Sequence, residues 1–303
     1  MQIETAHIPI QEVLLNFDAD VRLFIKREDM IHPFVSGNKF RKLKYNLAEA
    51  NKQNQRTLLT FGGAFSNHIA AVAAAGKIHK FQTIGIIRGE ELISKVETNP
   101  TLQFAVDNGM QLKFITRENY RKKTSKEFLG QLTAEFGRFY TIPEGGTNSL
   151  AVKGCAEIIT ETEKDFDTIC CAVGTGGTIA GISKGAYAHQ KVIGFPALKG
   201  DFLQEEIKPY VSTDNWTLIN AYHFGGYGKV TDELIQFINT FKNQTEIPLD
   251  PIYTGKMLYG IIDLIKKGHF AKQNRILAIH TGGLQGIEGM NRKLQRKGQK
   301  TIL

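Results

Sequence analysis

The sequence lacks the features that mark secreted, membrane-spanning and disulfide-built proteins. Only three of its 303 residues are cysteine, an odd number with no framework spacing. Two of them, Cys170 and Cys171, are adjacent, and we expect them to alternate across a buried strand as small hydrophobic residues of a reducing compartment. The first residues show no basic segment followed by an apolar stretch, and the longest small-apolar run, Ile69 to Ala75, is too short to span a bilayer. The sequence therefore predicts a cytoplasmic protein with no signal peptide and no membrane partner.

The charge is positive but not concentrated. The formal net charge is +8, and the lysines and arginines are scattered, with denser runs only at Arg117–Lys126 and Arg292–Lys300. There is no zinc-finger spacing and no basic strand with interleaved aromatic residues, so a solvated basic surface is favoured over nucleic-acid binding. We expect no nucleic-acid partner and no metal site. A positive surface can still attract small anions such as amino-acid carboxylates and phosphates.

Internal repeats, low-complexity tracts and a Pro/Gly/Ser-rich linker are also absent. Instead, short apolar strands alternate with helices. In the first half, strands are expected at Val21–Lys26, Thr57–Phe61, Phe81–Arg88, Gln111–Ile115 and Arg138–Ile142, and helices at Phe40–Asn51, Asn67–Lys77, Pro100–Asn108 and Ser125–Phe136. In the second half, strands are expected at Thr168–Val173, Val192–Pro196 and Arg275–His280. Helices are expected at Leu150–Lys164, from the glycine-rich turn Gly174–Thr178 through Tyr187, at Thr231–Gln244 and at Lys256–Lys267.

This alternation is typical of α/β proteins, in which mostly parallel sheets are flanked by helices. The first set of elements is large enough to be a small α/β domain, which we place at residues 46–146. Residues 1–45 together with 147–303 would then form a large domain. The sequence thus predicts a two-domain α/β fold in which ordered chain crosses the boundary.

A glycine-rich turn offers the clearest binding signal. Gly174-Thr175-Gly176-Gly177-Thr178 follows a predicted strand and precedes a helix. Residues without side chains let successive backbone N–H groups converge on an anion at the positive end of a helix, and the threonine hydroxyls add donors. A dinucleotide turn would need Gly or Ala where Ile179 stands, and no acidic residue ends the next strand. A phosphate cup that holds no nucleotide is favoured over a plain tight turn.

Two further segments carry candidate groups. Lys39 stands directly before a helix among small polar residues. A lysine in an enclosed site can have a lowered pKa and act as an amine nucleophile, although most lysines are surface charges. The segment Gly62–His68 joins a strand to a helix. Its Ser66 can simply cap that helix, or it can act with the helix N-terminus on a carboxylate.

Seven motifs occur in one order between about Phe24 and Gly283, which is most of the chain. They are Lys26-Arg27-Glu28-Asp29, Ser36-Gly37-Asn38-Lys39-Phe40-Arg41-Lys42-Leu43, Gly63-Ala64-Phe65-Ser66-Asn67-His68, Gly174–Thr178, Gly226-Tyr227-Gly228, Asp250-Pro251-Ile252-Tyr253-Thr254-Gly255-Lys256 and His280-Thr281-Gly282-Gly283. In this order they resemble the tryptophan-synthase-β-like superfamily of pyridoxal-phosphate (PLP) enzymes, fold type II. Within it, the sequence is similar to the branch of 1-aminocyclopropane-1-carboxylate (ACC) deaminase and D-cysteine desulfhydrase.

The resemblance implies PLP as the cofactor and assigns roles to the matching residues. Lys39 matches the lysine that forms the Schiff base. Asn38, Lys42 and the loop Gly174–Thr178 match the phosphate-binding groups, and Asn67 matches the asparagine beside the cofactor ring. Ser66, Asn67 and His68 match the junction that receives the substrate carboxylate. Tyr227 and Tyr253 match two tyrosines that flank the substrate, and Thr254 and Thr281 are the candidates to face the pyridine nitrogen.

The reaction implied by the resemblance is removal of an α-proton by Lys39, followed by loss of a β-substituent from a small amino acid. ACC deaminase has a glutamate where Thr254 stands, and a hydroxyl holds the ring nitrogen protonated less well than a carboxylate. The deaminase also has Ser-Asn-Gln where this chain has Ser66-Asn67-His68. Both differences favour β-elimination of the D-cysteine desulfhydrase kind, giving pyruvate, ammonia and sulfide, over cyclopropane ring opening.

Several alternatives stay open from the sequence. They are ACC deaminase itself, another dehydratase or racemase of the superfamily, and a ligand-binding protein that retains the fold without activity. A nicotinamide oxidoreductase is disfavoured by Ile179 and by the missing acidic residue. The chain departs from the family at Ile69-Ala70-Ala71, where an arginine is usual, and it is shorter than typical members. Homodimerisation is implied by the resemblance alone.

Overall fold

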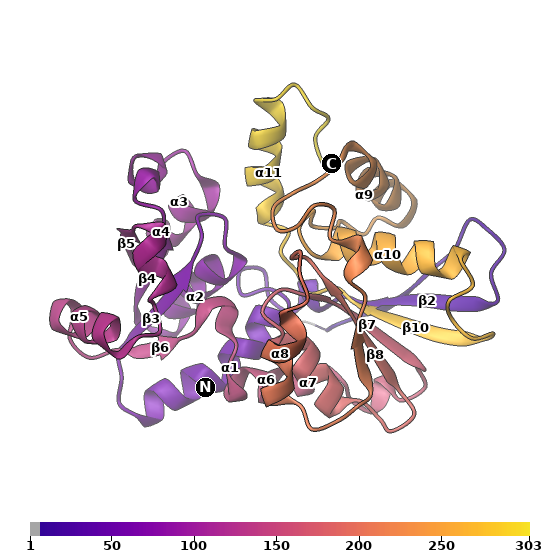
Figure 1. Cartoon of the computed structure of the whole chain (residues 1–303), viewed down its shortest axis with the longest axis horizontal. Coiled ribbons are helices and arrows are strands. Elements are labelled where there is room, and N and C mark those ends of the chain that lie inside the picture. Colours follow the sequence, from indigo (N-terminus) through magenta and orange to yellow (C-terminus); the bar gives the residue numbers. More distant parts are fainter. Residues whose placement is uncertain (1–6) are drawn as a thin grey trace.

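The larger of two sheets is built around a fully buried strand. The computed structural model describes residues 7–303, and its six-stranded sheet has the order β1 (Ile10–Val13), β2 (Val21–Lys26), β10 (Asn274–Ile279), β7 (Thr168–Val173), β8 (Lys191–Pro196) and β9 (Trp216–Leu218) (Figure 1). All neighbours are parallel except the edge strand β1, which is antiparallel to β2. In β7, Cys170 packs on one face and Cys171 on the other, which confirms the predicted alternation. Both are free thiols.

Helices cover both faces of this sheet. On one face lie α6 (Ser149–Ala156) and α7 (Gly177–Gly185), with α1 (Asn38–Lys52) packed against α6. On the other face lie α9 (Asp232–Thr245) and α10 (Thr254–Lys266), whose apolar side chains share a core with β7 and β8. The short helix α8 (Leu203–Ile207) packs on the α7 side. Such double covering explains why the strands are continuous apolar runs.

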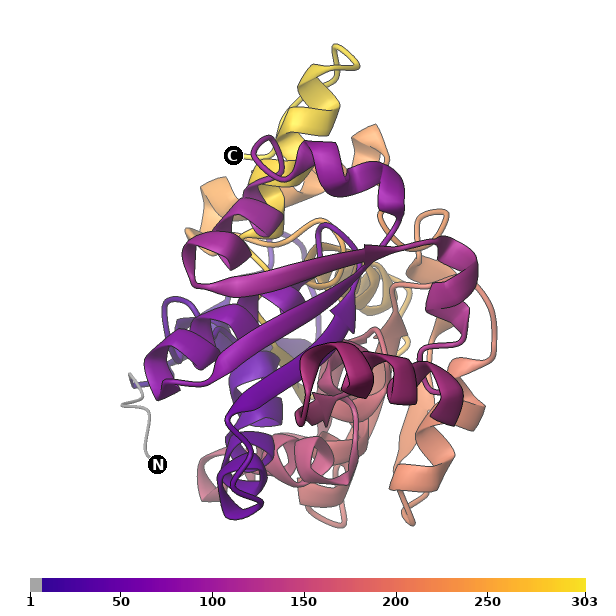
Figure 2. The ribbon, with the colours of Figure 1, turned by 90° about the vertical axis from the view of Figure 1, so that its left-hand side faces the viewer.

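The smaller sheet is all parallel. Its order is β5 (Met110–Ile115), β4 (Gln82–Arg88), β3 (Thr57–Gly62) and β6 (Tyr140–Ile142), and it faces the viewer in Figure 2. One face packs on α2 (Asn67–His79) and α3 (Pro100–Asp107), and the other on α4 (Arg117–Arg121) and α5 (Lys126–Phe136). Its strands all come from residues 57–142, as the sequence predicted for the small domain. The exact domain division stays a prediction.

The expected helix Leu150–Lys164 is wrong in its length. Helix α6 ends at Ala156, and a separate turn of 3-10 helix begins after Thr160, whose side chain and that of Glu163 form a capping box. Apolar residues recur at helical spacing on both sides of Thr160, so the sequence pattern does not show that a new helix begins there. The sequence analysis also missed β1, β9, α4, α8 and the C-terminal helix α11 (Gly286–Gln295), which packs against α3.

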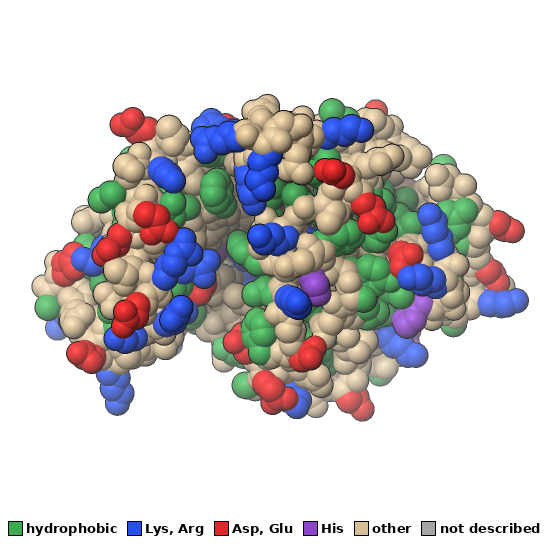
Figure 3. All heavy atoms as spheres, turned by 45° about the horizontal axis from the view of Figure 1, so that its top comes forward, with side chains coloured by type: hydrophobic (Ala, Val, Ile, Leu, Met, Phe, Trp, Pro, Cys, Tyr) green, Lys and Arg blue, Asp and Glu red, His purple; other side chains and the backbone are tan. Residues whose placement is uncertain are grey.

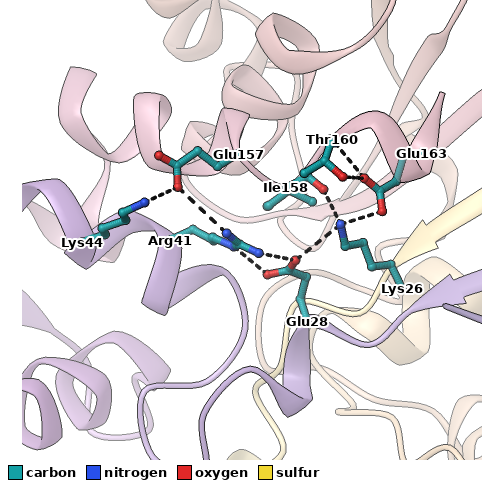
Figure 4. Close-up of polar contacts among 8 residues, drawn as sticks. All are labelled: Lys26, Glu28, Arg41, Lys44, Glu157, Ile158, Thr160 and Glu163. Carbon is teal, nitrogen blue, oxygen red and sulfur yellow. Dashed lines mark hydrogen bonds and ion pairs between the residues drawn. The ribbon is translucent and has the colours of Figure 1, made fainter. Parts of the chain in front are cut away.

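A buried network of ion pairs fastens α1 to the large sheet (Figure 4). Arg41 of α1 donates two hydrogen bonds of 2.9 Å each to the Glu28 carboxylate, which is fully buried. Lys26, at the end of β2, lies 4.0 Å from Glu28 and pairs with Glu163 at 2.8 Å. Glu157 lies 4.0 Å from Arg41 on the other side. Because every buried charge here has an opposite charge beside it, the start of α1 is held firmly in place.

Within residues 7–303, we find no helix that combines the length and the apolar character needed to cross a membrane.

Candidate active site

A cavity of about 400 Å³ opens where the strands of the two sheets end. Its walls come from the segments that follow β3, β7 and β10 and from the first turns of α1. In parallel α/β sheets the carboxyl ends of the strands are where ligands bind. Thirteen residues that the sequence singled out line it: Asn38, Lys39, Lys42, Ser66, Asn67, His68, Gly174, Thr175, Gly176, Thr178, Tyr227, Tyr253 and Thr281. Segments that are far apart in the chain thus meet as predicted.

Lys39 is placed in the cavity by an obligatory glycine. Gly37 has φ +59°, and a Cβ on it would lie 2.0 Å from the carbonyl oxygen of Thr281. The backbone N–H of Asn38 donates to the same carbonyl at 3.2 Å, so α1 begins against the end of β10. The Lys39 Nζ donates to the carbonyl of Gly145 at 3.3 Å. Burial, and then the neighbouring Lys42, hold the pKa of Lys39 well below its usual value, which favours the neutral, nucleophilic amine.

The glycine-rich turn and Lys42 form a cup of donors. Gly176 has φ +79°, which lets the chain turn directly from β7 into α7. The buried Lys42 Nζ donates to the carbonyl of Gly145 and to the hydroxyl of Thr147, each at 3.0 Å, and to the hydroxyl of Thr175 at 3.4 Å. All three acceptors are neutral, and burial lowers the Lys42 pKa. Such a buried cation without an opposite charge fits an anionic ligand group.

Asn38 and Gly177 hold neighbouring parts of this cup in position. The Asn38 side-chain amide donates to the Thr178 hydroxyl at 2.8 Å and so connects α1 to the start of α7. Gly177 does not line the cavity. A Cβ on it would lie 2.7 Å from the Thr147 hydroxyl, so its role is to let that threonine approach.

The junction after β3 presents a helix N-terminus to the same cavity. Ser66 caps α2, and its Oγ accepts from the backbone N–H of Ile69 at 3.3 Å. Asn67 accepts a hydrogen bond from Gln285 at 3.1 Å, which ties the junction to the loop before α11. The positive end of the helix dipole and these side chains suit a carboxylate.

His68 lies beside the two lysines with one nitrogen satisfied. The Thr60 hydroxyl donates to the carbonyl of Ile142, so its oxygen accepts from the His68 Nε2–H at 2.8 Å. The buried Nδ1 atom has no hydrogen-bond partner among residues 7–303. Burial, and then the charges of Lys39 and Lys42, hold the pKa of His68 well below its usual value. The imidazole is therefore kept neutral at the edge of the cavity.

Two tyrosine rings form one wall. The ring centroids of Tyr227 and Tyr253 are 6.2 Å apart at 62°, in an edge-to-face arrangement. Burial raises the pKa of both phenols, so both stay protonated at neutral pH. The loop that carries Tyr227 is anchored by Lys256, which donates to the carbonyls of His223 and Gly226 at 2.8 and 2.9 Å. Burial lowers the pKa of Lys256 to about 8.

Thr254, like Gly177, is a predicted residue that does not line the cavity. Its hydroxyl donates to Asp250 Oδ2 at 2.7 Å and accepts from the Asp250 backbone N–H at 2.9 Å, and the side chain is fully buried. Both hydrogen-bonding capacities are thereby used in starting α10. Thr281 does line the cavity. Of the two candidate threonines, Thr281 alone is therefore placed to contact a ligand.

Several lining residues were missed by the sequence analysis. Arg88 ends β4, and Gly145 follows β6 and accepts from both Lys39 and Lys42. Glu144, Phe34 and Gln285 also line the cavity. The rule that ligands bind at the carboxyl ends of parallel strands could have indicated Arg88 and Gly145. No motif singled them out.

Comparison with known proteins gives matches over nearly the whole chain. The sequence model of a family described as pyridoxal-phosphate dependent enzyme matches residues 8–282. A bifunctional D-cysteine desulfhydrase/1-aminocyclopropane-1-carboxylate deaminase of Arabidopsis thaliana mitochondria is 34% identical over 292 residues, covering 88% of this chain and 73% of that protein. A 1-aminocyclopropane-1-carboxylate deaminase of Rhizobium rhizogenes is 30% identical over 300 residues and covers 89% of both chains.

A solved structure agrees with these relatives. The crystal structure of an ACC deaminase homologue superposes with a TM-score of 0.82 at 28% identity, covering 97% of this chain and 95% of that one. The structure of an O-ureido-L-serine synthase, at 12% identity and a TM-score of 0.68, shares the fold over 92% of this chain. The two-sheet α/β architecture is therefore that of fold type II, as the sequence predicted.

Proposed function

The chain belongs to the family of pyridoxal-phosphate dependent enzymes, and from this premise we propose that it is a lyase that eliminates the β-substituent of a small amino acid. Its preferred reaction is of the D-cysteine desulfhydrase kind, in which D-cysteine and water give pyruvate, ammonia and hydrogen sulfide. The observation that carries the proposal is the meeting of a desolvated Lys39 amine, an anion cup and a carboxylate junction in one cavity.

The residues present fit the cofactor. Within residues 7–303, the buried Lys42 amine donates to neutral oxygens alone, and the glycine turn before α7 adds backbone donors, so a phosphate would supply the missing negative charge. Asn38, Lys42 and the loop Gly174–Thr178 would hold that phosphate. Asn67 and Thr281 would contact the ring, and Lys39 would form the covalent link.

When bound, pyridoxal phosphate supplies a carbonyl carbon that amines can attack and a ring that accepts the electron pair released from Cα. The chain's own residues do the rest. Ser66, Asn67 and the backbone N–H groups at the start of α2, including that of His68, would orient the substrate carboxylate. The neutral Lys39 Nζ accepts the Cα proton, for which its lowered pKa is suited. The phenols of Tyr227 and Tyr253, which their raised pKa values keep protonated, would donate a proton to the departing sulfur.

ACC deamination is the second candidate. It is supported by the names of the relatives and of the solved homologue. Thr254 stands where the deaminase has glutamate, and its hydroxyl is occupied by Asp250, so no carboxylate is offered by that position. This favours elimination over ring opening. The family resemblance also supports a homodimer, and the three free, buried cysteines support a reducing compartment such as the cytoplasm; we propose both.

The test is a screen of D- and L-cysteine, D-serine and ACC for keto-acid release by the purified protein. We expect pyruvate and sulfide from D-cysteine. The protein should also absorb violet light, and borohydride should remove this absorption and fix the cofactor on the peptide containing Lys39. Lys39→Ala should lower kcat by about 10³-fold or more, whereas Lys44→Ala, on the exposed side of the same helix, should keep activity. Release of 2-oxobutanoate from ACC without pyruvate from cysteine would establish the second candidate. A protein that stays colourless and unlabelled with PLP would contradict both.

A further inference from the structure

A second, smaller hollow adjoins the main cavity and carries mostly positive side chains. It has a volume of about 250 Å³ and is lined by Arg88, Arg117, Tyr120, Arg121, Lys123 and Glu144. Arg88 and Glu144 line the main cavity as well, so these two residues stand between the two spaces. In Figure 3, Lys and Arg side chains gather on the left-hand rim of the hollow between the two halves of the molecule.

The positive charges in this hollow are only partly neutralised. Arg117 pairs with Glu91 at 2.6 Å, and Lys123 pairs with Glu144 at 3.2 Å. Arg88 and Arg121 have no carboxylate within 4.0 Å among residues 7–303. Two guanidinium groups therefore face a shared space without a counter-ion, although acidic residues are plentiful elsewhere on the surface.

The floor of the hollow holds a buried hydroxyl that makes no hydrogen bond of normal length and geometry, although the Glu144 carboxylate lies close to it. Tyr120 is 3% exposed, and its phenol oxygen has no hydrogen-bond partner among the described residues. The Arg88 guanidinium carbon and the Lys123 amine lie 5.6 and 4.9 Å from the centre of its ring. Burial, and then the nearby Glu144 carboxylate, raise the Tyr120 pKa, so the hydroxyl stays a donor. Leaving such a group without a partner is unfavourable unless a ligand satisfies it.

We propose that Arg88, Tyr120 and Arg121 form a binding site for a small doubly charged oxyanion, such as a phosphate monoester. Planar guanidinium groups can each donate two parallel hydrogen bonds to such an anion, and the phenol adds a third donor. The anion has two possible sources. It is either a free molecule that binds beside the main cavity, or the distal group of an acidic substrate that reaches past Arg88. In the first case the site is independent of the reaction in the main cavity, and in the second it rests on the proposed function.

Inorganic phosphate is the first probe, and its binding is measured calorimetrically at constant ionic strength. The holoenzyme is used with its cofactor fixed by borohydride, so that the cup at Lys42 is already filled. Arg121→Ala should weaken phosphate binding about tenfold, the loss expected for one charge-assisted hydrogen-bonding group. Lys122→Ala is the matched control, because Lys122 is the next residue, carries the same charge, pairs with Glu118 and does not line the hollow. Equal affinities in the two variants would overturn the proposal.

Tyr120→Phe tests the site without removing a charge. The change deletes the unsatisfied hydroxyl, so it should raise the melting temperature of the protein and at the same time weaken phosphate binding about threefold. A role that is only structural would not move the two measurements in opposite directions. Unchanged phosphate affinity in Tyr120→Phe would exclude the phenol and with it the proposed site.

Competition then separates the two sources of the anion. If phosphate raises the KM of an amino acid with a side-chain phosphate monoester but not that of cysteine, the site belongs to the substrate. If phosphate binds with the same affinity whether or not the acidic amino acid is present, the site takes a free oxyanion. A failure of the proposed reaction would appear as absent keto acid, and a failure of this site would appear as phosphate binding that does not depend on Arg121.

Discussion

Helix α1 places basic side chains in two opposite environments within four residues. Arg41 points to the large sheet and meets the Glu28 carboxylate in two hydrogen bonds, with Glu157 behind it. Lys39 and Lys42 point to the cavity, where their hydrogen-bond acceptors are a carbonyl and hydroxyl groups. We call Lys26, Glu28, Arg41, Glu157 and Glu163 the paired cluster. Lys39 and Lys42 are the unpaired lysines.

The difference shows how charge is divided between folding and binding. In the paired cluster the chain itself supplies the opposite charge, so the cations are satisfied in the folded protein. The unpaired lysines are desolvated without compensation, which lowers the pKa of both. Such groups destabilise the unloaded protein, and they become favourable only when a ligand brings a negative charge. A buried cation without an anion therefore marks the ligand site better than the sequence pattern alone.

Breaking the paired cluster should have the largest effect on stability. Glu28→Gln keeps the shape but leaves Arg41 without its bidentate partner, so the free energy of unfolding should fall by about 3 kcal/mol. This is near the lower end of the usual range for a broken buried pair, because Glu157 still lies 4.0 Å from Arg41. Urea unfolding of the cofactor-free protein measures it. Glu12→Gln is the control, since its exposed pair with Arg22 should contribute less than about 1 kcal/mol. Equal losses in both variants would contradict the comparison.

Removing an unpaired lysine should have the opposite sign in the unloaded protein. Lys42→Met deletes a buried cation that only neutral oxygens satisfy, so the cofactor-free protein should be as stable as before or more stable. Its affinity for pyridoxal phosphate should fall about 10- to 100-fold, because a charge-assisted contact to the phosphate is lost. Titration followed by absorbance measures the affinity. Lys44→Met, which removes an exposed charge paired with Glu157, should leave the affinity unchanged.

Much of the fold could be predicted because buried parallel strands are short apolar runs between helices. Cys170 and Cys171 lie on opposite faces of β7 as their spacing requires. The edge strands β1 and β9 were missed since three or four half-exposed residues carry no clear period. Helix α11 was missed because its charged residues resemble a basic surface run.

The site could be predicted where a motif marked the end of a strand, and not elsewhere. Thr175 and Ser66 belong to such motifs and line the cavity. Arg88 ends a strand without any motif, so only the assembled sheet shows that it faces the cavity. Thr254 follows Tyr253 directly, yet its hydroxyl turns to Asp250 while the tyrosine lines the cavity. Which of two neighbours faces a ligand depends on how α10 begins, and this is set by the hydrogen bonds that Thr254 makes with Asp250, four residues before it.

The low pKa of His68, which lies beside the unpaired lysines, should also be visible in the pH dependence of the free energy of unfolding. Burial and the two lysines hold the pKa of His68 well below the ordinary value of about 6.5. Above that value His68 is neutral in both states, and its contribution is constant. As the pH falls below it, the unfolded chain binds a proton that the folded protein refuses, so stability declines until the folded pKa is reached. His68→Gln should flatten the decline measured by urea unfolding between pH 7 and 5, whereas His269→Gln, at an exposed position, should not.

The smallest effect is expected at Thr254, where the residue lies next to the site but outside it. Thr254→Val removes a hydroxyl that makes two hydrogen bonds with Asp250. The free energy of unfolding should therefore fall by about 1 kcal/mol, and kcat should change less than about twofold. Thr281→Val, at a residue that lines the cavity, should instead shift the absorption of the bound cofactor and reduce kcat with little loss of stability. Comparing the two spectra decides which threonine contacts the ring. A spectral shift in Thr254→Val alone would mean that loading the cofactor rearranges the start of α10 and turns the hydroxyl away from Asp250. The distinction between residues that serve the fold and residues that serve the ligand would then hold only for the unloaded protein.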